Sequence, residues 1–197
     1  MEDFKLFFQL GWEHIISLDA LDHLLFIAAL TSLYNLYNWR KVLILITSFT
    51  IGHSLTLALA SLSVIQFNNS WIEFLIPLTI IITCIFNIFQ KENISDKNVR
   101  LNYFFALFFG LIHGMGFANT IRFMLMKSQT ITLPLLSFNI GIEAGQILVV
   151  LSLLYIAHIF IAAAGLKQKW WTIVISGISG IIAFYMCITR LPLTNFN

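Results

Sequence analysis

The sequence predicts an all-α protein, a polytopic bundle of transmembrane helices in a single integral membrane domain covering residues 1–197. Of its 197 residues, 59% are hydrophobic and only 10% are charged, whereas soluble domains average about 25% charged residues. The apolar residues also form continuous runs of about 20 residues, long enough to cross a bilayer as helices. Transmembrane β-barrels instead show an alternating pattern, so a barrel is excluded.

About six apolar runs are expected to span the membrane. In chain order they cover approximately residues 18–37, 42–65, 71–89, 101–121, 133–164 and 171–189. The fifth run is longer than a bilayer requires, so we expect it to be tilted or kinked. Residues 3–16 are too short to cross and predict a short N-terminal interfacial or re-entrant helix. The connections are short, which leaves no room for a soluble domain, and no internal repeat stands out.

Lysine and arginine are distributed unevenly between the two ends of this bundle. The loops after the first, third and fifth spans hold seven of the 11, and the opposite side holds four. Cytoplasmic loops are enriched in these residues, so both termini are predicted to lie outside. The first ten residues lack a basic n-region, which argues against a cleavable signal peptide. A net charge of +2 with no basic run predicts a lipid bilayer, and no nucleic acid, as partner.

Four spans carry a titratable residue between the midplane and the outer face. At about 1.5 Å per helical residue, His53, His113 and Glu143 lie near the midplane, and His23 lies nearer the outer surface. Such residues are costly in lipid unless they are paired, hydrated or bound to a metal. Because these four come from separate spans and reach similar depths, we expect them to share one site.

The stretch Trp12–Phe26 is expected to form the outer part of this site. Asp22 adjoins His23, and His14 would join them if the chain bends back between them. The predicted metal ligands are His14, Asp22, His23, His53, His113 and Glu143. Around them, Asp19, Ser54, Asn139 and Gln146 are candidates for the hydrogen-bonding partners that ligands in metal sites require.

Imidazole and carboxylate together suit a divalent transition metal ion, with zinc or nickel expected first, better than magnesium or calcium. Cys84 and Cys187 lie in separate runs, so a thiolate site is not expected. Structural alternatives stay open for single residues. A lone membrane histidine such as His53 can serve as an interhelical hydrogen-bonding group, Asp22 can cap a helix, and His14 can be hydrated at the interface.

Five polar motifs run through most of the chain. They are Gly11-Trp-Glu-His14, Asp22-His-Leu-Leu-Phe26, Phe49-Thr-Ile-Gly-His-Ser54, Phe109-Gly-Leu-Ile-His-Gly-Met-Gly-Phe117 and Phe138-Asn-Ile-Gly-Ile-Glu-Ala-Gly-Gln146. With these motifs the chain resembles the HupE/UreJ family of small bacterial membrane proteins, associated with hydrogenase and urease systems and proposed as nickel permeases. The resemblance implies a metal-binding protein of the bacterial inner membrane.

Two departures separate the chain from the nickel-permease branch of that family. Seven residues lie between His14 and Asp22, where that branch has five. The histidine and glutamate that the branch combines in one later motif stand in different spans here, at His113 and Glu143. The chain therefore looks like the second, less characterised branch, and the resemblance does not imply nickel as the substrate.

The first function that fits is a divalent-metal permease. The N-terminal stretch would capture the ion from outside, and His53, His113 and Glu143 would pass it towards the midplane. Without a nucleotide-binding motif, such a permease would use a gradient or act as a homo-oligomer. Its weak point is the inner half of the membrane, where only His158 continues a polar path.

The alternative is an intramembrane zinc-dependent hydrolase. Several histidines would hold the zinc ion and leave one position for water, while Asp22 or Glu143 would act as the general base. A site in the outer half suits this alternative, because an enzyme needs no exit towards the cytoplasm.

Overall fold

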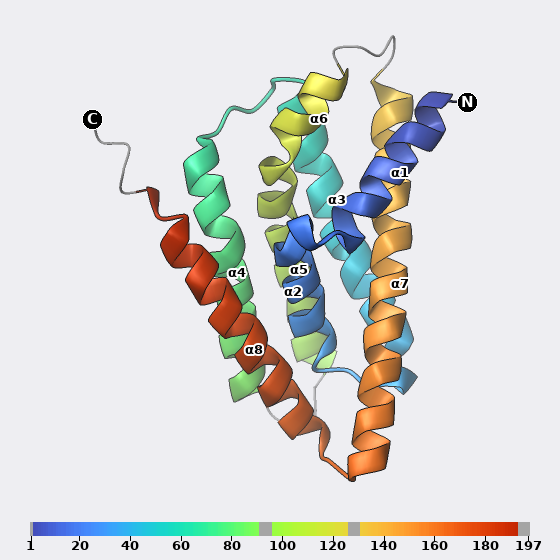
Figure 1. The fold of residues 1–197 in the computed structure, drawn as a ribbon, viewed down its shortest axis with the longest axis vertical. Coiled ribbons are helices and arrows are strands. Elements are labelled where there is room, and N and C mark those ends of the chain that lie inside the picture. The colour runs from blue at the N-terminus through green and yellow to red at the C-terminus, as the bar shows by residue number, and fades with distance from the viewer. Residues whose placement is uncertain (1, 91–95, 126–130, 193–197) are drawn as a thin grey trace.

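In the computed structural model, residues 2–90, 96–125 and 131–192 are described, and they fold as helices joined by turns (Figure 1). The helices are α1 (Glu2–Ile16), α2 (Leu21–Thr31), α3 (Trp39–Ser61), α4 (Asn69–Phe89), α5 (Asp96–Gly116), α6 (Ala118–Leu125), α7 (Thr132–Ala164) and α8 (Gln168–Thr189). Short 3-10 turns, η1 (Leu18–Ala20) and η2 (Leu36–Asn38), precede α2 and α3. The predicted all-α class is confirmed.

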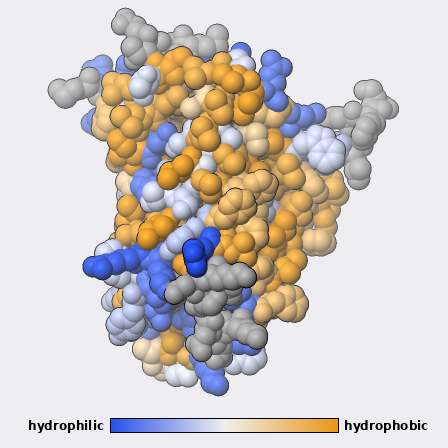
Figure 2. All heavy atoms as spheres, turned by 180° about the vertical axis from the view of Figure 1, so that it is seen from behind, coloured by the Kyte–Doolittle hydropathy of each residue, from blue (hydrophilic) through white to orange (hydrophobic). Residues whose placement is uncertain are grey.

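Four helical stretches are each long and apolar enough to cross a membrane. They are Leu36–Ser61, Asn69–Phe89, Thr132–Ala164 and Gln168–Thr189. Two bent pairs, α1 with α2 at 64° and α5 with α6 at 50°, raise the number of spans to six if each pair crosses as one. Hydrophobic residues cover much of the face in Figure 2, and hydrophilic ones gather towards its lower end. The protein is an integral membrane protein.

The first span is built differently from the single run expected over residues 18–37. Helix α2 has 11 residues and extends only about 17 Å, too little to cross a bilayer. Together with α1, from which it is separated by a bend at residues 17–20, it is long and apolar enough to count as one broken span or as a re-entrant segment. The fourth run likewise breaks at Phe117, between α5 and α6. Hydropathy alone does not reveal these bends, because apolar residues continue on both sides of them.

The described chain starts and ends at the same end of the bundle, which we call the upper end (Figure 1). Helices α1, α2, α4 and α7 run downwards from it, whereas α3, α5, α6 and α8 run upwards. The bent pair α1–α2 and the bent pair α5–α6 therefore cross in opposite directions.

Glycines allow two helix pairs to approach very closely. In the pair α1 and α7, a Cβ on Gly11 would overlap the backbone oxygen of Phe138, and one on Gly141 would overlap that of Phe8. Only glycine, which has no Cβ, permits backbones this close. Helix α1 is therefore fixed lengthwise against α7.

The pair α3 and α5 repeats these contacts. A Cβ on Gly110 would overlap the backbone oxygen of Phe49, and one on Gly52 would overlap that of Leu107. The spacing along the chain from Gly11 to Gly110 equals that from Phe8 to Leu107. Each contact in one pair thus has a counterpart in the other.

These contacts reveal an internal repeat, which the sequence was not expected to contain. The pattern Gly-x-x-His occurs at residues 11–14 and 110–113, and Phe-x-Ile-Gly occurs at 49–52 and 138–141. In each half the order is a bent span, a span paired through glycine, and a third span. Since the halves run in opposite directions (Figure 1), α1–α4 and α5–α8 form an inverted-topology repeat. Without the contacts between the helix pairs, two short motifs in apolar surroundings are too weak a signal to predict the repeat from the sequence.

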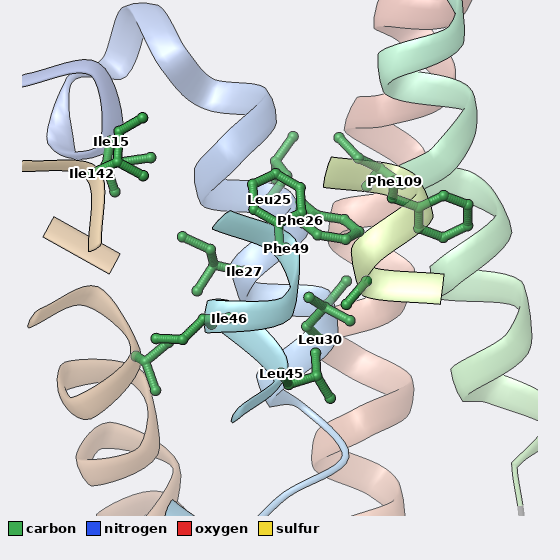
Figure 3. Close-up of a cluster of buried hydrophobic side chains, with 14 of the residues drawn as sticks. Ile15, Leu25, Phe26, Ile27, Leu30, Leu45, Ile46, Phe49, Phe109 and Ile142 are labelled. Atoms are coloured by element: carbon green, nitrogen blue, oxygen red, sulfur yellow. The ribbon is translucent and has the colours of Figure 1, made fainter. Parts of the chain in front are cut away.

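The middle of the bundle is filled by aromatic and aliphatic side chains. Phe26, Phe49 and Phe109 come together there from α2, α3 and α5 (Figure 3). The ring centroids of Phe26 and Phe49 lie 5.0 Å apart, and those of Phe26 and Phe109 lie 6.0 Å apart. This layer lies directly beneath the polar site described next.

Candidate metal site

Four histidines meet in the middle of the bundle, each from a different helix. They are His14 on α1, His23 on α2, His53 on α3 and His113 on α5. The ring centroids of His14 and His23 lie 4.6 Å apart, and each lies 5.9 Å or less from that of His53. His113 joins the group through His23, at 5.2 Å. We call these four residues the histidine cluster.

The bend between α1 and α2 brings His14 and His23 together. His14 lies near the end of α1, and His23 lies in the first turn of α2. Because the two helices meet at an angle of 64°, both rings face the same region inside the bundle. The fold-back that His14 needs in order to join the site is therefore present.

Several ring nitrogens of the histidine cluster are buried without a hydrogen-bond partner. They are Nε2 of His14 and of His23, both nitrogens of His53 and Nδ1 of His113. An unsatisfied buried polar atom costs about 1–3 kcal/mol, and folded proteins rarely tolerate several in one place. A bound cation would satisfy one nitrogen of each ring and leave only the second nitrogen of His53 without a partner, so the residues present fit a metal ion.

Three of the four histidines fit one ion directly. One nitrogen each of His14, His23 and His53 lie within 4.8 Å of one another. Nitrogen ligands bind zinc at about 2.0–2.1 Å, so small side-chain rotations would bring these atoms onto a common ion. His53 is fully buried, at 0% exposed, which makes it the deepest of the three.

Asp22 orients His23. The Nδ1 of His23 lies 3.0 Å from Oδ1 of Asp22, and the same oxygen accepts a hydrogen bond from the backbone N–H of His23 at 2.9 Å. Nδ1–H therefore donates to the carboxylate, and the lone pair of the ring lies on Nε2. The other carboxylate oxygen lies 3.5 Å from Arg190. Asp22 thus occupies the place of an outer-shell carboxylate, which fixes the tautomer of a metal-binding histidine.

Thr79 has the same effect on His113. Its hydroxyl donates to the carbonyl of Ile76 at 2.7 Å, which uses its single proton. It therefore accepts the hydrogen bond from Nε2 of His113, at 3.1 Å. The lone pair of this imidazole is then on Nδ1, one of the nitrogens without a partner. His113 thus has a free ring nitrogen beside the other three rings, but it is not among the histidines whose nitrogens lie within 4.8 Å of one another.

A cavity of about 530 Å³ connects the histidine cluster to the upper end of the bundle. His14, His23 and His113 line its inner part, and the exposed Glu13 and Glu73 line it nearer its mouth together with Arg190. Carboxylates at the mouth raise the local concentration of cations. A hydrated ion could thus reach the ring nitrogens from this side.

The polar residues of α7 lie apart from the cluster. Glu143 accepts a 2.6 Å hydrogen bond from Thr47, and Gln146 accepts one of 2.7 Å from Thr50. Thr47 precedes His53 by six residues on α3, which places it about 120° away around the helix. The structure therefore does not bring Glu143 into the histidine cluster, and the hydrogen bond of Gln146 is to Thr50, not to a histidine. These four side chains form what we call the α3–α7 seam.

Three further predicted partners have other surroundings. Asn139 is half-buried on α7, and its Oδ1 has no hydrogen-bond partner. Ser54 is half-buried and follows His53 directly on α3, so it points to another side of the helix. The side chain of Asp19 lies outside the described residues.

Sequence reasoning missed Thr79 and Arg190 as partners of the site. Threonine is common in membrane helices, where its hydroxyl bonds to the preceding turn, so nothing singled out Thr79. Arg190 follows the last apolar run and was counted only for its charge. Both gain their role from helix packing, which places them beside His113 and Asp22.

Comparison with known proteins gives an independent assignment. The family described as HupE / UreJ protein matches residues 1–190, which include every helix in the described part of the chain. No curated protein and no solved structure matches the chain. The matching family is known for nickel- or cobalt-related membrane proteins, which agrees with a histidine cluster that could hold a metal ion. The chain belongs to the HupE/UreJ family.

Proposed function

We propose that this protein is a permease for a divalent transition metal ion such as zinc or nickel. The observation that carries the proposal is the convergence of His14, His23, His53 and His113 with buried ring nitrogens that lack partners. Imidazole nitrogen selects divalent transition metals over magnesium or calcium. The metal ion is the substrate in this proposal.

The inverted repeat supports transport. Inverted-topology repeats are a recurrent architecture of secondary transporters, in which the substrate site lies near the midplane at the interface of the two repeats. The histidine cluster lies between the two repeats, since α1, α2 and α3 belong to one repeat and α5 to the other. His14 and His113 also occupy equivalent positions in the two Gly-x-x-His motifs.

We further propose that the protein lies in a bacterial inner membrane with its upper end outside. The lower connections carry most of the lysine and arginine residues, as the positive-inside rule requires. The large cavity then opens to the outside. Glu13 and Glu73 attract the ion, His14 and His23 receive it, and His53 completes its coordination at the deepest position.

A zinc-dependent hydrolase is the second candidate, and the one-sided access to the histidine cluster favours it. Three histidine ligands and one open position are typical of catalytic zinc sites. In this function a water in the cavity would be activated, and Asp22 would orient His23. Glu13, which lines the cavity, is then the carboxylate best placed to accept a proton.

Zinc uptake into proteoliposomes tests the permease. We expect uptake by the wild-type protein, and His53→Ala should weaken zinc binding by about a hundredfold or more because it removes the deepest ligand. His158→Ala is the matched control, since His158 is exposed near the lower end of α7 and contacts the ring of Tyr37. Tight zinc binding without any uptake would reject the permease and leave the hydrolase.

A further inference from the structure

A buried polar stripe continues from the histidine cluster into the lower half of the bundle. Thr79, Thr83 and Asn87 follow one another at intervals of four residues on α4, so they share one face of that helix. Their exposed fractions are 3%, 7% and 4%. Thr79 contacts His113, and Asn87 donates to the backbone oxygen of Ala29 near the end of α2. The stripe therefore begins at the cluster and leads downwards.

A second, smaller cavity of about 50 Å³ lies along this stripe. It lies between the lower parts of α2, α4 and α5, its lining is mostly aliphatic and aromatic, and Thr83, Asn87 and Asn102 supply its polar atoms. A space of this size with several polar groups can hold a few water molecules. Metal binding at the histidine cluster does not by itself explain this second cavity, whereas passage of the ion through it would.

The barrier between the two cavities is thin. On α5, His113 lines the upper cavity and Phe109 the lower one, and four residues correspond to about 6 Å along a helix. Phe26 fills this gap, with its ring 5.2 Å from that of His113 and 6.0 Å from that of Phe109. Figure 3 shows Phe26 and Phe49 facing Phe109 across this gap.

We propose that the ion leaves the histidine cluster between α2, α4 and α5, along Thr79, Thr83 and Asn87, and that Phe26 and Phe109 close this route in the present conformation. This inference rests on the proposed permease function. In this route, the hydroxyl and amide groups of Thr79, Thr83 and Asn87 form the inner half of the ion pathway. The inner half then needs no titratable residue.

Opening this route requires α2 to move away from α4. The lower end of α2 is held by Asn87, which donates to Ala29, and by Thr172 of α8, which donates to the carbonyl of Ser32 at 2.6 Å. Ser32 and Ser176 also lie within hydrogen-bonding distance, at 3.3 Å. The bonds from α8 to Ser32 join the second repeat to the first, so they can break and reform as the two repeats shift, whereas the bond of Asn87 to Ala29 joins α4 to α2 within the first repeat.

Zinc uptake by proteoliposomes of Thr83→Val tests the route. Valine has nearly the same shape as threonine but no hydroxyl, so we expect uptake to slow about tenfold, as for the loss of one polar contact of about 1.4 kcal/mol. The dissociation constant for zinc should not change, and Thr83→Ser should restore uptake. Thr31→Val is the control, because Thr31 also bonds to its own helix, at Ile27, and lines neither cavity.

The outcomes separate the route from the function. If the wild type takes up zinc and Thr83→Val does so at the same rate, the proposed route is wrong and the permease function stands. If the wild type binds zinc but does not take it up, both the route and the permease function are wrong. Labelling provides a second measurement if Thr83→Val is unstable. In a background with Cys84→Ser and Cys187→Ser, Thr83→Cys should react with a water-soluble thiol reagent from the lower side during zinc transport. Reaction from the upper side alone, or none, would contradict the route.

Discussion

At the scale of single residues, the chemistry of the site depends on which nitrogen of each histidine is free. Asp22 accepts a hydrogen bond from Nδ1–H of His23, and Thr79 accepts one from Nε2–H of His113. Each hydrogen bond turns the bare nitrogen towards the interior of the cluster. The outer residues thus prepare the ligands before any ion arrives.

Asp22→Asn tests this arrangement. An amide at this position can present its NH₂ to the ring and favour the wrong tautomer, so we expect zinc affinity to fall by about 10–100-fold. Isothermal titration on detergent-solubilised protein would measure the change. The control is Asp3→Asn, which alters an exposed carboxylate in the first turn of α1. Equal affinities for Asp22→Asn and the wild type would exclude the orienting role.

Glu143→Gln separates the α3–α7 seam from the histidine cluster. Glutamine retains an oxygen that can accept the hydrogen bond from Thr47, and the side chain lies outside the cluster. We expect zinc affinity to remain within about twofold of the wild type, a difference below 0.5 kcal/mol. The same titration measures it. A loss as large as that of His53→Ala would instead make Glu143 a ligand.

The sequence located most of this site because histidines within apolar runs are rare and costly. His23, His53 and His113 stood out for this reason and His14 through its place in the stretch Trp12–Phe26, and the structure brings the four rings together. Depth along a helix does not give the direction in which a side chain points. Glu143 reaches a similar depth on the other side of α3, where it bonds to Thr47.

At the scale of helices, the close pairs α1–α7 and α3–α5 hold the cluster together. Gly110 and Gly114 both face the backbone of α3, at Phe49 and His53. They fix the height of His113 relative to His53. Because backbone meets backbone, neither helix can shift to admit even a methyl group.

Gly110→Ala should therefore lower stability. The added methyl group would push α5 away from Phe49, and overpacking of this kind costs about 1–3 kcal/mol. Thermal unfolding in detergent would detect a lower Tm. Gly177→Ala on α8 is the control, since no atom lies within 4 Å of its added Cβ, and alanine should raise helix stability by up to about 1 kcal/mol. A Gly110→Ala variant as stable as Gly177→Ala would contradict the close pairing.

The breaks in α1–α2 and α5–α6 explain why element boundaries were harder to predict than the number of spans. Composition reports how many residues are apolar, and that quantity changes little at Phe117 or between residues 16 and 21. The bends follow from contacts with helices distant in sequence. The positions of the apolar runs could be predicted from the sequence, whereas the breaks that divide two of them into separate helices could not.

At the scale of the whole molecule, the two repeats share a fold but not a set of side chains. His14 and His113 correspond to each other, while Ile142 stands where the first repeat has His53. The position equivalent to His23 is Arg122. The histidine cluster is therefore an asymmetric feature on a nearly symmetric scaffold, and in the described part of the chain it lies at the junction of the two repeats.

The inverted repeat also has a consequence for biogenesis. During membrane insertion the two repeats must take opposite orientations across the membrane. Because they have the same architecture, their shape does not determine which orientation each repeat takes. Charge has to decide, since seven of the 11 lysine and arginine residues belong to the lower side; two of the seven, Arg40 and Lys41, lie in the first turn of α3, while Arg122 lies on α6 at the upper end. Arg40→Gln with Lys41→Gln should therefore yield a fraction of inverted chains. Labelling of Asn68→Cys from each side of the membrane, in a background with Cys84→Ser and Cys187→Ser, would measure that fraction, and uniform labelling from one side would show that other residues set the direction of insertion.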